Sequence, residues 1–316
     1  MELIVLGNVA MDHYLFLESF SWDQEKIRAR SSEFLPGGTM GNFACAVSRL
    51  GLKTGFVGVV GKDQFGGLLR KDFEKCGIDT THLRTRSKGE TPVTVLIWDK
   101  TGNRVNIIPP SIHIDIRDLD DAYLGRAKVL HTHLFDFDLC RHCAQIMSKN
   151  RAIFSLDLEL HRVRDFPDSK LNELLSLTRV LFCNSQTLAY LVPGTEVGEA
   201  ARQLRSRGPE TVVVTQGNQG SLAVQAKEKV VRIPPVSVEA IDPTGAGDCF
   251  AGGFFYGYLK GWPLPKIMVY ASAASASVVT QIGARTGQPN LEEFLSMGKA
   301  LLQSTRIKRV KKGNRP

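Results

Sequence analysis

The feature that most constrains the fold is an alternation of short apolar runs with segments of helical periodicity along most of the 316 residues. The apolar runs are continuous, which is typical of strands buried on both faces. Such strands separated by helices predict a doubly wound α/β fold, a mostly parallel sheet flanked by helices. The predicted strands begin at Leu3, Thr54, Lys128, Ala152, Arg179, Thr211 and Ser221, and helices are predicted over 41–50, 63–76, 138–149, 169–177, 197–207, 247–259, 265–279 and 291–302.

Two stretches interrupt the alternation and predict a small separate sheet. Residues 92–99 and 104–109 have extended patterns, and the composition of Lys100–Asn103 between them is that of a hairpin turn. The first of the two stretches is Tyr14–Trp22. It carries apolar side chains on both faces, because Tyr14, Phe16, Phe20 and Trp22 alternate with Leu15 and Leu17. A sheet with two apolar faces needs a second covering partner.

The segment Asp242–Leu259 reads DPTGAGDCFAGGFFYGYL and predicts a glycine-rich loop that runs into a helix. The backbone N–H groups of Gly245, Ala246 and Gly247 can form one concavity, to which the start of the helix adds the positive end of its dipole. Such a loop is a site for phosphate. Three glycines inside the helix, Gly252, Gly253 and Gly257, each disfavour helix formation and therefore indicate very close packing.

Asp248 stands at the junction of this loop and the helix. A carboxylate beside an anion site would repel a phosphate if binding were its only task, so its predicted role is that of a general base. A hydroxyl between Asp248 and the phosphoryl group could lose its proton as it attacks phosphorus. The alternative is an ordinary helix N-cap aspartate.

The segment DPTGAGDCFAGGF resembles the C-terminal signature of the ribokinase-like (PfkB) carbohydrate kinases. A second segment, Gly37–Gly61 followed by KDQFGGLL, is similar to the N-terminal signature of the same family. The resemblance implies one ribokinase-like kinase domain over 1–304, with a lid formed by about 14–35 and 88–110. It also implies ATP and Mg²⁺ as cofactors, and in many members K⁺.

The resemblance assigns roles to individual positions. It implies that Asp248, Gly245, Ala246 and Gly247 are catalytic, that Asp12, Gly37, Gly38 and Asn42 bind the sugar, that Asn184, Thr215, Gly217 and Gly220 bind ATP, and that Asp242 and Thr244 hold a monovalent cation. These residue types suit the roles, because a carboxylate accepts hydroxyl hydrogen bonds and a diglycine allows close approach of backbone. The segment TQGNQG around Gly217 is equally consistent with a plain hairpin turn.

The chain departs from the family pattern after its fifth core strand. Many members have Asn-x-x-Glu there, where the glutamate organises magnesium through water, whereas this chain has Asn184 followed by Thr187. Threonine cannot supply that charge. Asp157 or Glu159 is then the expected source of a carboxylate near the metal.

The net charge of +8 is concentrated at the C-terminus. Residues 305–316 hold six basic and no acidic residues, so that 34 of the 40 basic residues stand against 32 acidic ones elsewhere. We therefore predict a disordered basic tail, and contact with nucleic acid is not expected. No apolar run approaches the length of a membrane span, and the N-terminus lacks the basic region of a signal peptide.

The six cysteines lie in helical or strand patterns, which indicates a reducing, cytoplasmic setting. His131, His133, Cys140 and Cys143 have ligand-like spacing, but no second close pair supports zinc.

The function predicted from the sequence is phosphorylation of a hydroxyl of a small sugar by ATP. A nucleoside kinase of the same fold needs an aromatic residue to stack on the base, and a sugar-phosphate kinase needs a basic cluster near the lid. The candidates are Phe16, Phe135 and Phe137 for the first, and Lys88, Lys100 and Arg104 for the second. A binding protein without catalysis is a further alternative, against which the intact Asp248 argues. We also expect a homodimer that forms through the lid.

Overall fold

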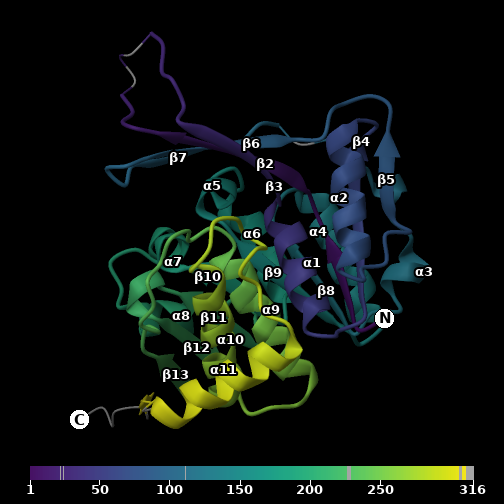
Figure 1. Cartoon of the computed structure of the whole chain (residues 1–316). Coiled ribbons are helices and arrows are strands. Elements are labelled where there is room, and N and C mark those ends of the chain that lie inside the picture. Colours follow the sequence, from purple (N-terminus) through teal and green to yellow (C-terminus); the bar gives the residue numbers. More distant parts are fainter. Residues whose placement is uncertain (22, 24, 111, 226–228, 306–307, 311–316) are drawn as a thin grey trace.

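A central sheet and a smaller sheet form the framework of the chain (Figure 1). The computed structural model describes residues 1–21, 23, 25–110, 112–225, 229–305 and 308–310. In this part of the chain ten strands form the central sheet, in the order β14-β13-β12-β11-β10-β9-β8-β1-β4-β5. They are β1 (Leu3–Leu6), β4 (Thr54–Gly61), β5 (Leu83–Arg86), β8 (Val129–His133), β9 (Ile153–Leu158), β10 (Val180–Asn184), β11 (Thr211–Thr215), β12 (Ser221–Gln225), β13 (Lys229–Ile233) and β14 (Lys308–Val310).

The strands from β5 to β11 run parallel, and β12, β13 and β14 add antiparallel at one edge. The strand order reverses at β1, since β4 and β5 lie on one side of it and β8 to β11 on the other. In doubly wound sheets the carboxyl ends of the strands on either side of such a reversal leave a crevice where ligands bind.

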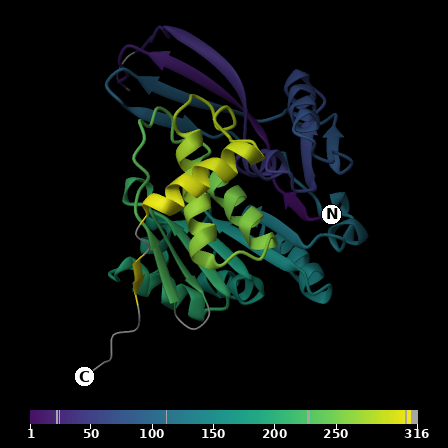
Figure 2. The ribbon, with the colours of Figure 1, turned by 60° about the horizontal axis from the view of Figure 1, so that its bottom comes forward.

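Helices cover both faces of the central sheet and enclose two apolar cores (Figure 2). One core lies beneath α1, α2, α9, α10 and α11, and the other beneath α3, α4, α6, α7 and α8. Their bounds are α1 (Thr39–Arg49), α2 (Gln64–Lys75), α3 (Asp121–Leu124), α4 (Phe137–Lys149), α5 (Leu160–Val163), α6 (Asp168–Leu177), α7 (Ser185–Leu191), α8 (Val197–Ser206), α9 (Ala246–Leu259), α10 (Leu264–Val278) and α11 (Leu291–Ser304), with short 3-10 turns η1 (Ile116–Asp118) and η2 (Gly217–Gln219).

The glycines of α9 allow this helix to pack closely against two neighbours, as the sequence predicts. A Cβ on Gly252 would lie 2.9 Å from the Cβ of Ala46 on α1, and one on Gly253 would lie 3.0 Å from the Cα of Ala271 on α10. Both separations are shorter than a carbon–carbon contact allows. The helix that carries Asp248 is thereby fixed against the core.

The small sheet projects beyond the carboxyl ends of the parallel strands and forms the predicted lid (Figure 1). Its strand order is β3-β2-β6-β7. The turn at Lys100–Asn103 joins β6 and β7 as an antiparallel hairpin, and Asp99 accepts hydrogen bonds from its backbone. The bounds are β2 (Ala10–Leu17), β3 (Ser31–Gly37), β6 (Val93–Asp99) and β7 (Arg104–Ile107).

The side chains of the lid alternate between an inner and an outer face, as its register requires. Tyr14 and Phe16 lie on the inner face with Trp98, which stands opposite Phe16. Leu15 lies on the outer face opposite Ile97. The prediction of two apolar faces is confirmed for β2, and Trp22 lies outside the described residues.

Several elements were not predicted from the sequence. The strands β5 and β13 and the helix α7 are short, and their apolar residues are too few to stand out as a periodic pattern. Within the predicted disordered tail, Lys308–Val310 pair with β13 as the edge strand β14. The expectation of a tail without structure is therefore wrong for these three residues, while residues 306–307 and 311–316 lie outside the description.

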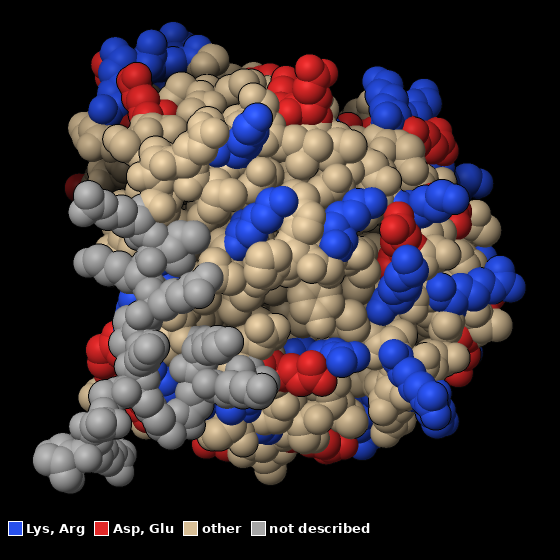
Figure 3. Space-filling view, turned by 90° about the horizontal axis from the view of Figure 1, so that it is seen from below, with Lys and Arg blue, Asp and Glu red and all other residues tan. Residues whose placement is uncertain are grey.

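Charged side chains of both signs are spread over one face of the molecule. On the face shown in Figure 3, Lys and Arg side chains are dispersed, with acidic side chains between several of them. This spacing forms no continuous basic stripe on that face. Among the described residues, every helix is too short or too polar to cross a lipid bilayer.

Candidate active site

The carboxyl ends of the parallel strands meet at a cavity of about 340 Å³ below the lid. Asn8 follows β1, His133 ends β8, Asn184 ends β10 and Thr215 ends β11, and all four line the cavity. The side chains of the lid strands close it from the other side. The cavity lies where the reversal of the strand order at β1 predicts a ligand site.

The predicted phosphate loop forms one wall of the cavity. Gly245 is the N-cap of α9, has φ +79°, and no side chain caps the first-turn N–H groups of the helix. A Cβ on Gly245 would lie 2.5 Å from the carbonyl oxygen of Ala284, so glycine is required there. Gly247 is exposed, and a Cβ on it would point into open space. The N–H of Ala246 donates to the carbonyl oxygen of Pro243 at 3.2 Å, and the amides of Gly245 and Gly247 lie beside a space that can hold an anion.

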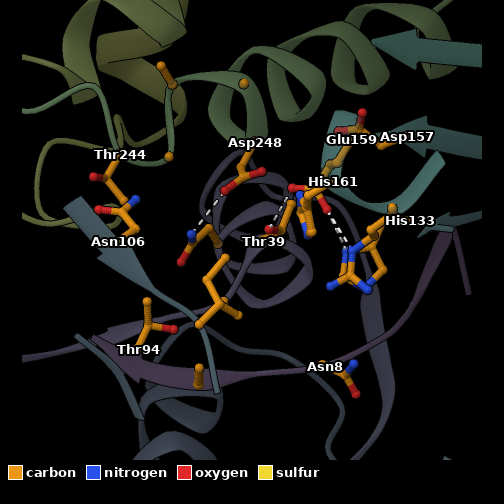
Figure 4. A pocket seen from close by; sticks show the side chains of 18 of the residues that line it. Asn8, Thr39, Thr94, Asn106, His133, Asp157, Glu159, His161, Thr244 and Asp248 are labelled. Carbon is orange, nitrogen blue, oxygen red and sulfur yellow. Dashed lines mark hydrogen bonds and ion pairs between the residues drawn. The ribbon is translucent and has the colours of Figure 1, made fainter. Parts of the chain in front are cut away.

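Asp248 lies in the first turn of α9 and faces the cavity (Figure 4). Since Gly245 occupies the N-cap position, the alternative reading of Asp248 as an N-cap is wrong. The side-chain amide of Asn42 donates a hydrogen bond of 2.9 Å to Asp248 Oδ2. The second carboxylate oxygen remains available to a hydroxyl group.

Arg285 contacts Asn42 of this pair and was not predicted from the sequence. Its Nε donates to Asn42 Oδ1 at 3.0 Å, a second nitrogen donates to the carbonyl oxygen of Gly37 at 2.5 Å, and a third pairs with Asp72. The guanidinium is almost completely buried. Because Arg285 donates to the amide oxygen of Asn42, it leaves the amide nitrogen to point toward Asp248. No motif in the sequence marks this arginine.

The electrostatics of the cavity raise the pKa of two carboxyl groups. Burial raises the pKa of Asp248 to about 7, against the opposing effects of the Asn42 hydrogen bond and the charge of Arg285. Burial also raises the pKa of Asp12 to about 7, again opposed by Arg285. A carboxylate with a pKa near neutrality is a stronger base than an ordinary aspartate and is still partly ionised at physiological pH.

Asp12 lies on β2, at the base of the lid, and is only 5% exposed. A Cβ on Gly37 would overlap its carboxylate, so that glycine permits the close contact between β2 and β3. Asp12, Gly38 and Asn42 all line the cavity. The predicted sugar-binding residues therefore lie together, with Gly37 directly behind them.

A second cluster lies across the cavity, at the ends of β8 and β9. Glu159 Oε2 is 3.4 Å from His133 Nδ1 and 3.0 Å from Arg162 Nε, and Thr39 Oγ1 donates to Glu159 Oε1 at 3.4 Å (Figure 4). Burial favours the neutral acid, but His133 and Arg162 outweigh it and hold the pKa of Glu159 at about 2. Burial, with the charges of Glu159 and Asp248, raises the pKa of Asp157 beside it.

Three of the four predicted ATP-binding residues lie around a second cavity of about 320 Å³. Thr215, Gly217 and Gly220 line it, and the loop is also the hairpin turn between β11 and β12. The reading of TQGNQG as a hairpin turn is confirmed, and its role in ATP binding stays a prediction. Thr215 and Gly247 line both cavities, so the phosphate loop stands between the two.

Asn184 lines the main cavity and caps α7. Its Oδ1 accepts hydrogen bonds from the backbone N–H of Thr187 at 2.8 Å and from the Thr187 hydroxyl at 3.0 Å. Thr187 is fully buried and does not line either cavity. The side chain that replaces the family glutamate therefore serves the start of the helix.

Asp242 lies behind the phosphate loop and is fully buried. Its Oδ1 accepts from the backbone N–H of Thr244 at 2.8 Å, and its Oδ2 accepts from the N–H of Gly283 at 2.8 Å and from the hydroxyl of Tyr14 at 2.9 Å. Thr244 itself lines the cavity. Through Tyr14, the carboxylate joins the lid to the phosphate loop.

Comparison with known proteins identifies the family. The sequence model of the family described as pfkB family carbohydrate kinase matches residues 1–291. The chain belongs to this family. As a member it is an ATP-dependent carbohydrate kinase, and the resemblance seen in its two signatures is confirmed.

The relatives of the chain are named for different substrates. The chain is 29% identical to a ribokinase of Haemophilus influenzae over 93% of its length and 97% of that protein, and 28% identical to a nucleoside kinase of Methanothermobacter thermautotrophicus over 92% and 94%. The crystal structure of a ribokinase from Thermotoga maritima superposes with a TM-score of 0.84 at 26% identity, covering 94% of this chain and 99% of that one. The predicted ribokinase-like fold is confirmed.

Proposed function

We propose that the chain transfers the γ-phosphoryl group of ATP to a hydroxyl of a small free sugar. The observation that carries this proposal is the position of Asp248, which faces the main cavity from the first turn of α9 while Gly247 beside it borders both cavities. A sugar below the lid and a nucleotide in the second cavity would then meet at the phosphate loop.

In this mechanism Asp248 accepts the proton of the attacking hydroxyl. Asn42 fixes the orientation of the carboxylate, since its amide donates to one oxygen only. The amides of Gly245 and Gly247 stabilise the charge on the transferring phosphoryl group, in the way of an oxyanion hole, while the N–H of Ala246 holds the turn through Pro243. Asp12 accepts hydrogen bonds from other sugar hydroxyls and positions the ring.

ATP is proposed to enter as its magnesium complex. The donor set fits a hard cation, because Glu159 offers an ionised carboxylate to the cavity and Asp157 lies beside it. Magnesium neutralises charge on the phosphates when it is bound. The chain would then hold the ion through phosphate oxygens, water and Glu159.

A monovalent cation such as K⁺ is proposed to bind near Asp242 and Thr244. Among the described residues no Lys or Arg side chain forms an ion pair with the fully buried Asp242, and buried charges are normally paired or bound to metal. Replacing K⁺ by tetramethylammonium is expected to lower turnover. Equal turnover in both salts would remove this part of the proposal.

The residues that would favour the two rival substrates are placed elsewhere. Phe16, Phe135 and Phe137 are not among the described residues that line the main cavity, nor are Lys88, Lys100 and Arg104. Arg162 does line it, but its charge is paired with Glu159. A free sugar is therefore favoured over a nucleoside or a sugar phosphate.

A decisive test compares Asp248→Asn with the unchanged protein. We expect the variant to retain sugar affinity, measured by calorimetry, and to lose at least about 100-fold in kcat, the usual contribution of a general base. The substrate is found first by phosphorylation assays with sugars, nucleosides and sugar phosphates. Undiminished turnover in Asp248→Asn would disprove the catalytic assignment, and turnover of nucleosides alone would disprove the substrate class.

We propose further that two chains associate through the outer faces of their lids. Phe34 is 45% exposed and Ile107 is 46% exposed on that face, where Leu15 and Ile97 lie between them. Exposed apolar sheet faces are typical of subunit interfaces. Light scattering is expected to show a dimer that Ile97→Asp dissociates, while Leu68→Asp on α2 leaves it intact. A monomer in the unchanged protein would refute it.

A further inference from the structure

A group of metal-ligating side chains lies between α1 and α2, outside both cavities. It consists of Cys45, Asp72 and Cys76, hereafter the thiol cluster, and one ligand atom from each lies within 4.8 Å of the other two. Asp72 and Cys76 are four residues apart at the end of α2 and therefore share one face of that helix. Cys45 meets them from α1.

The separations in the thiol cluster suit a tetrahedral ion. Cys45 Sγ lies 3.8 Å from Asp72 Oδ2. A tetrahedral zinc ion, with bonds of about 2.3 Å to sulfur and about 2.0 Å to oxygen, holds two such ligands about 3.5 Å apart. The small remaining adjustment falls to Asp72, whose side chain is partly exposed, since Cys45 is fully buried.

The surroundings of the thiol cluster act in opposite directions on its two thiols. The hydrogen bond between them, together with burial, raises the pKa of Cys45, and the same hydrogen bond lowers the pKa of Cys76. Arg285 pairs with Asp72 and lies close enough to both cysteines to act on their ionisation. Two sulfur ligands and one carboxylate select a soft divalent cation, since magnesium and calcium prefer oxygen ligands only.

We propose that Cys45, Asp72 and Cys76 bind one soft divalent cation of the zinc class, with water as the fourth ligand. Each thiol releases its proton to solvent as its sulfur binds the ion, so two protons leave for each ion bound. Zn²⁺ reaches the site from the side of Asp72 and Cys76, which are both partly exposed.

The position of the thiol cluster links it to the catalytic carboxylate. Asp72 pairs with Arg285, Arg285 donates to Asn42, and Asn42 donates to Asp248. A bound cation shares the charge of Asp72 and so weakens its pairing with Arg285. Binding is therefore expected to lower kcat about 2- to 30-fold, the range typical of such coupling.

Cobalt is the probe for binding to the reduced, full-length protein, in a buffer with a phosphine reductant. We expect one Co²⁺ per chain, a near-ultraviolet sulfur-to-cobalt charge-transfer band, and the strong visible bands of tetrahedral coordination. Cys76→Ser should abolish the charge-transfer band, and Cys143→Ser, a cysteine buried in α4, should retain it. No such band in the unchanged protein, or a band that survives in Cys76→Ser, overturns the proposal.

Two further measurements make the outcome independent of how the variants fold. Zn²⁺ should protect Cys76 of the unchanged protein from alkylation by iodoacetamide, as mapped by mass spectrometry, and equal alkylation with and without Zn²⁺ overturns the site. Zn²⁺ at saturating Mg-ATP should lower kcat in the unchanged protein and not in Cys76→Ser. Equal inhibition of both proteins overturns the link to Asp248. A Cys45–Cys76 disulfide in a protein that binds no cobalt after reduction identifies a redox pair and overturns the metal site.

Discussion

The two ends of the main cavity are built in different ways. The end proposed to bind phosphate consists of backbone amides and one carboxylate from a single continuous segment, 242–248. The end proposed to bind the sugar consists of side chains from the lid, from α1 and from the ends of β8 and β9, which are far apart in the chain. Chemistry that is common to a family can be carried by one rigid segment, whereas the choice of substrate is spread over elements that can vary separately.

The largest expected effect comes from a substitution at the proposed phosphate end alone. In Gly247→Val the new side chain would project into the open space above the first turn of α9, where the phosphoryl group is proposed to lie. We expect kcat to fall by about 100-fold or more, as when a donor is removed from an oxyanion hole. Sugar affinity, measured by calorimetry, should not change.

Gly67→Val is the matched control, because a Cβ on Gly67 of α2 also points into open space. It should retain full activity. Full activity in Gly247→Val as well would mean that the loop does not hold phosphate.

The next effect tests the sugar end. Asp12→Asn removes a charge that is proposed to accept hydroxyl hydrogen bonds, so the dissociation constant of the sugar should rise about 10- to 100-fold, as for other hydrogen bonds to charged groups. Turnover at saturating sugar should fall much less. A variant that loses kcat and keeps its sugar affinity would show that Asp12 belongs with the catalytic end.

A pH profile reports on both ends together. Asp248 and Asp12 each have a pKa raised to about 7, and both are expected to act as carboxylates. Below pH 7 both become protonated, so kcat/KM should fall by more than tenfold for each pH unit. In Asp12→Asn only one titration remains, and the slope should return to tenfold. A profile that stays flat down to pH 5 would contradict both assignments.

The smallest effect concerns stability in the absence of substrates. The pKa of Asp248 is raised on folding from 3.8 to about 7, so the folded protein binds this proton more tightly than the unfolded chain does. The group therefore costs stability as pH rises from 4 to 7. Asp248→Asn should melt about 4–8 °C higher than the unchanged protein at pH 8, with the difference vanishing near pH 4. Equal melting temperatures at pH 8 would contradict the raised pKa.

The same division explains what could be predicted from the sequence. The parallel strands, the hairpin at Lys100–Asn103 and the loop before α9 follow from local patterns, because each depends on residues that are adjacent in the chain. The contacts of Asp248 with Asn42 were open to prediction only through the family signatures.

Arg285 shows where such reasoning ends. Its role depends on Asn42, Gly37 and Asp72, which are more than 200 residues away in the sequence. Nothing in the residues next to it indicates a buried guanidinium. The thiol cluster was missed for the same reason, since only the packing of α1 on α2 brings Cys45 to Cys76.

The hydrogen bond from Tyr14 to Asp242 has a consequence for the order in which the enzyme can work. A lid that swings open must break this bond and leave a buried carboxylate with one donor fewer, a cost of about 1.5–3 kcal/mol. We therefore expect the closed form to be the resting form, with substrates entering during brief openings. A sugar bound as proposed, in contact with both Asp12 and the core, would prolong closure and with it the hydrogen bond from Tyr14 to Asp242.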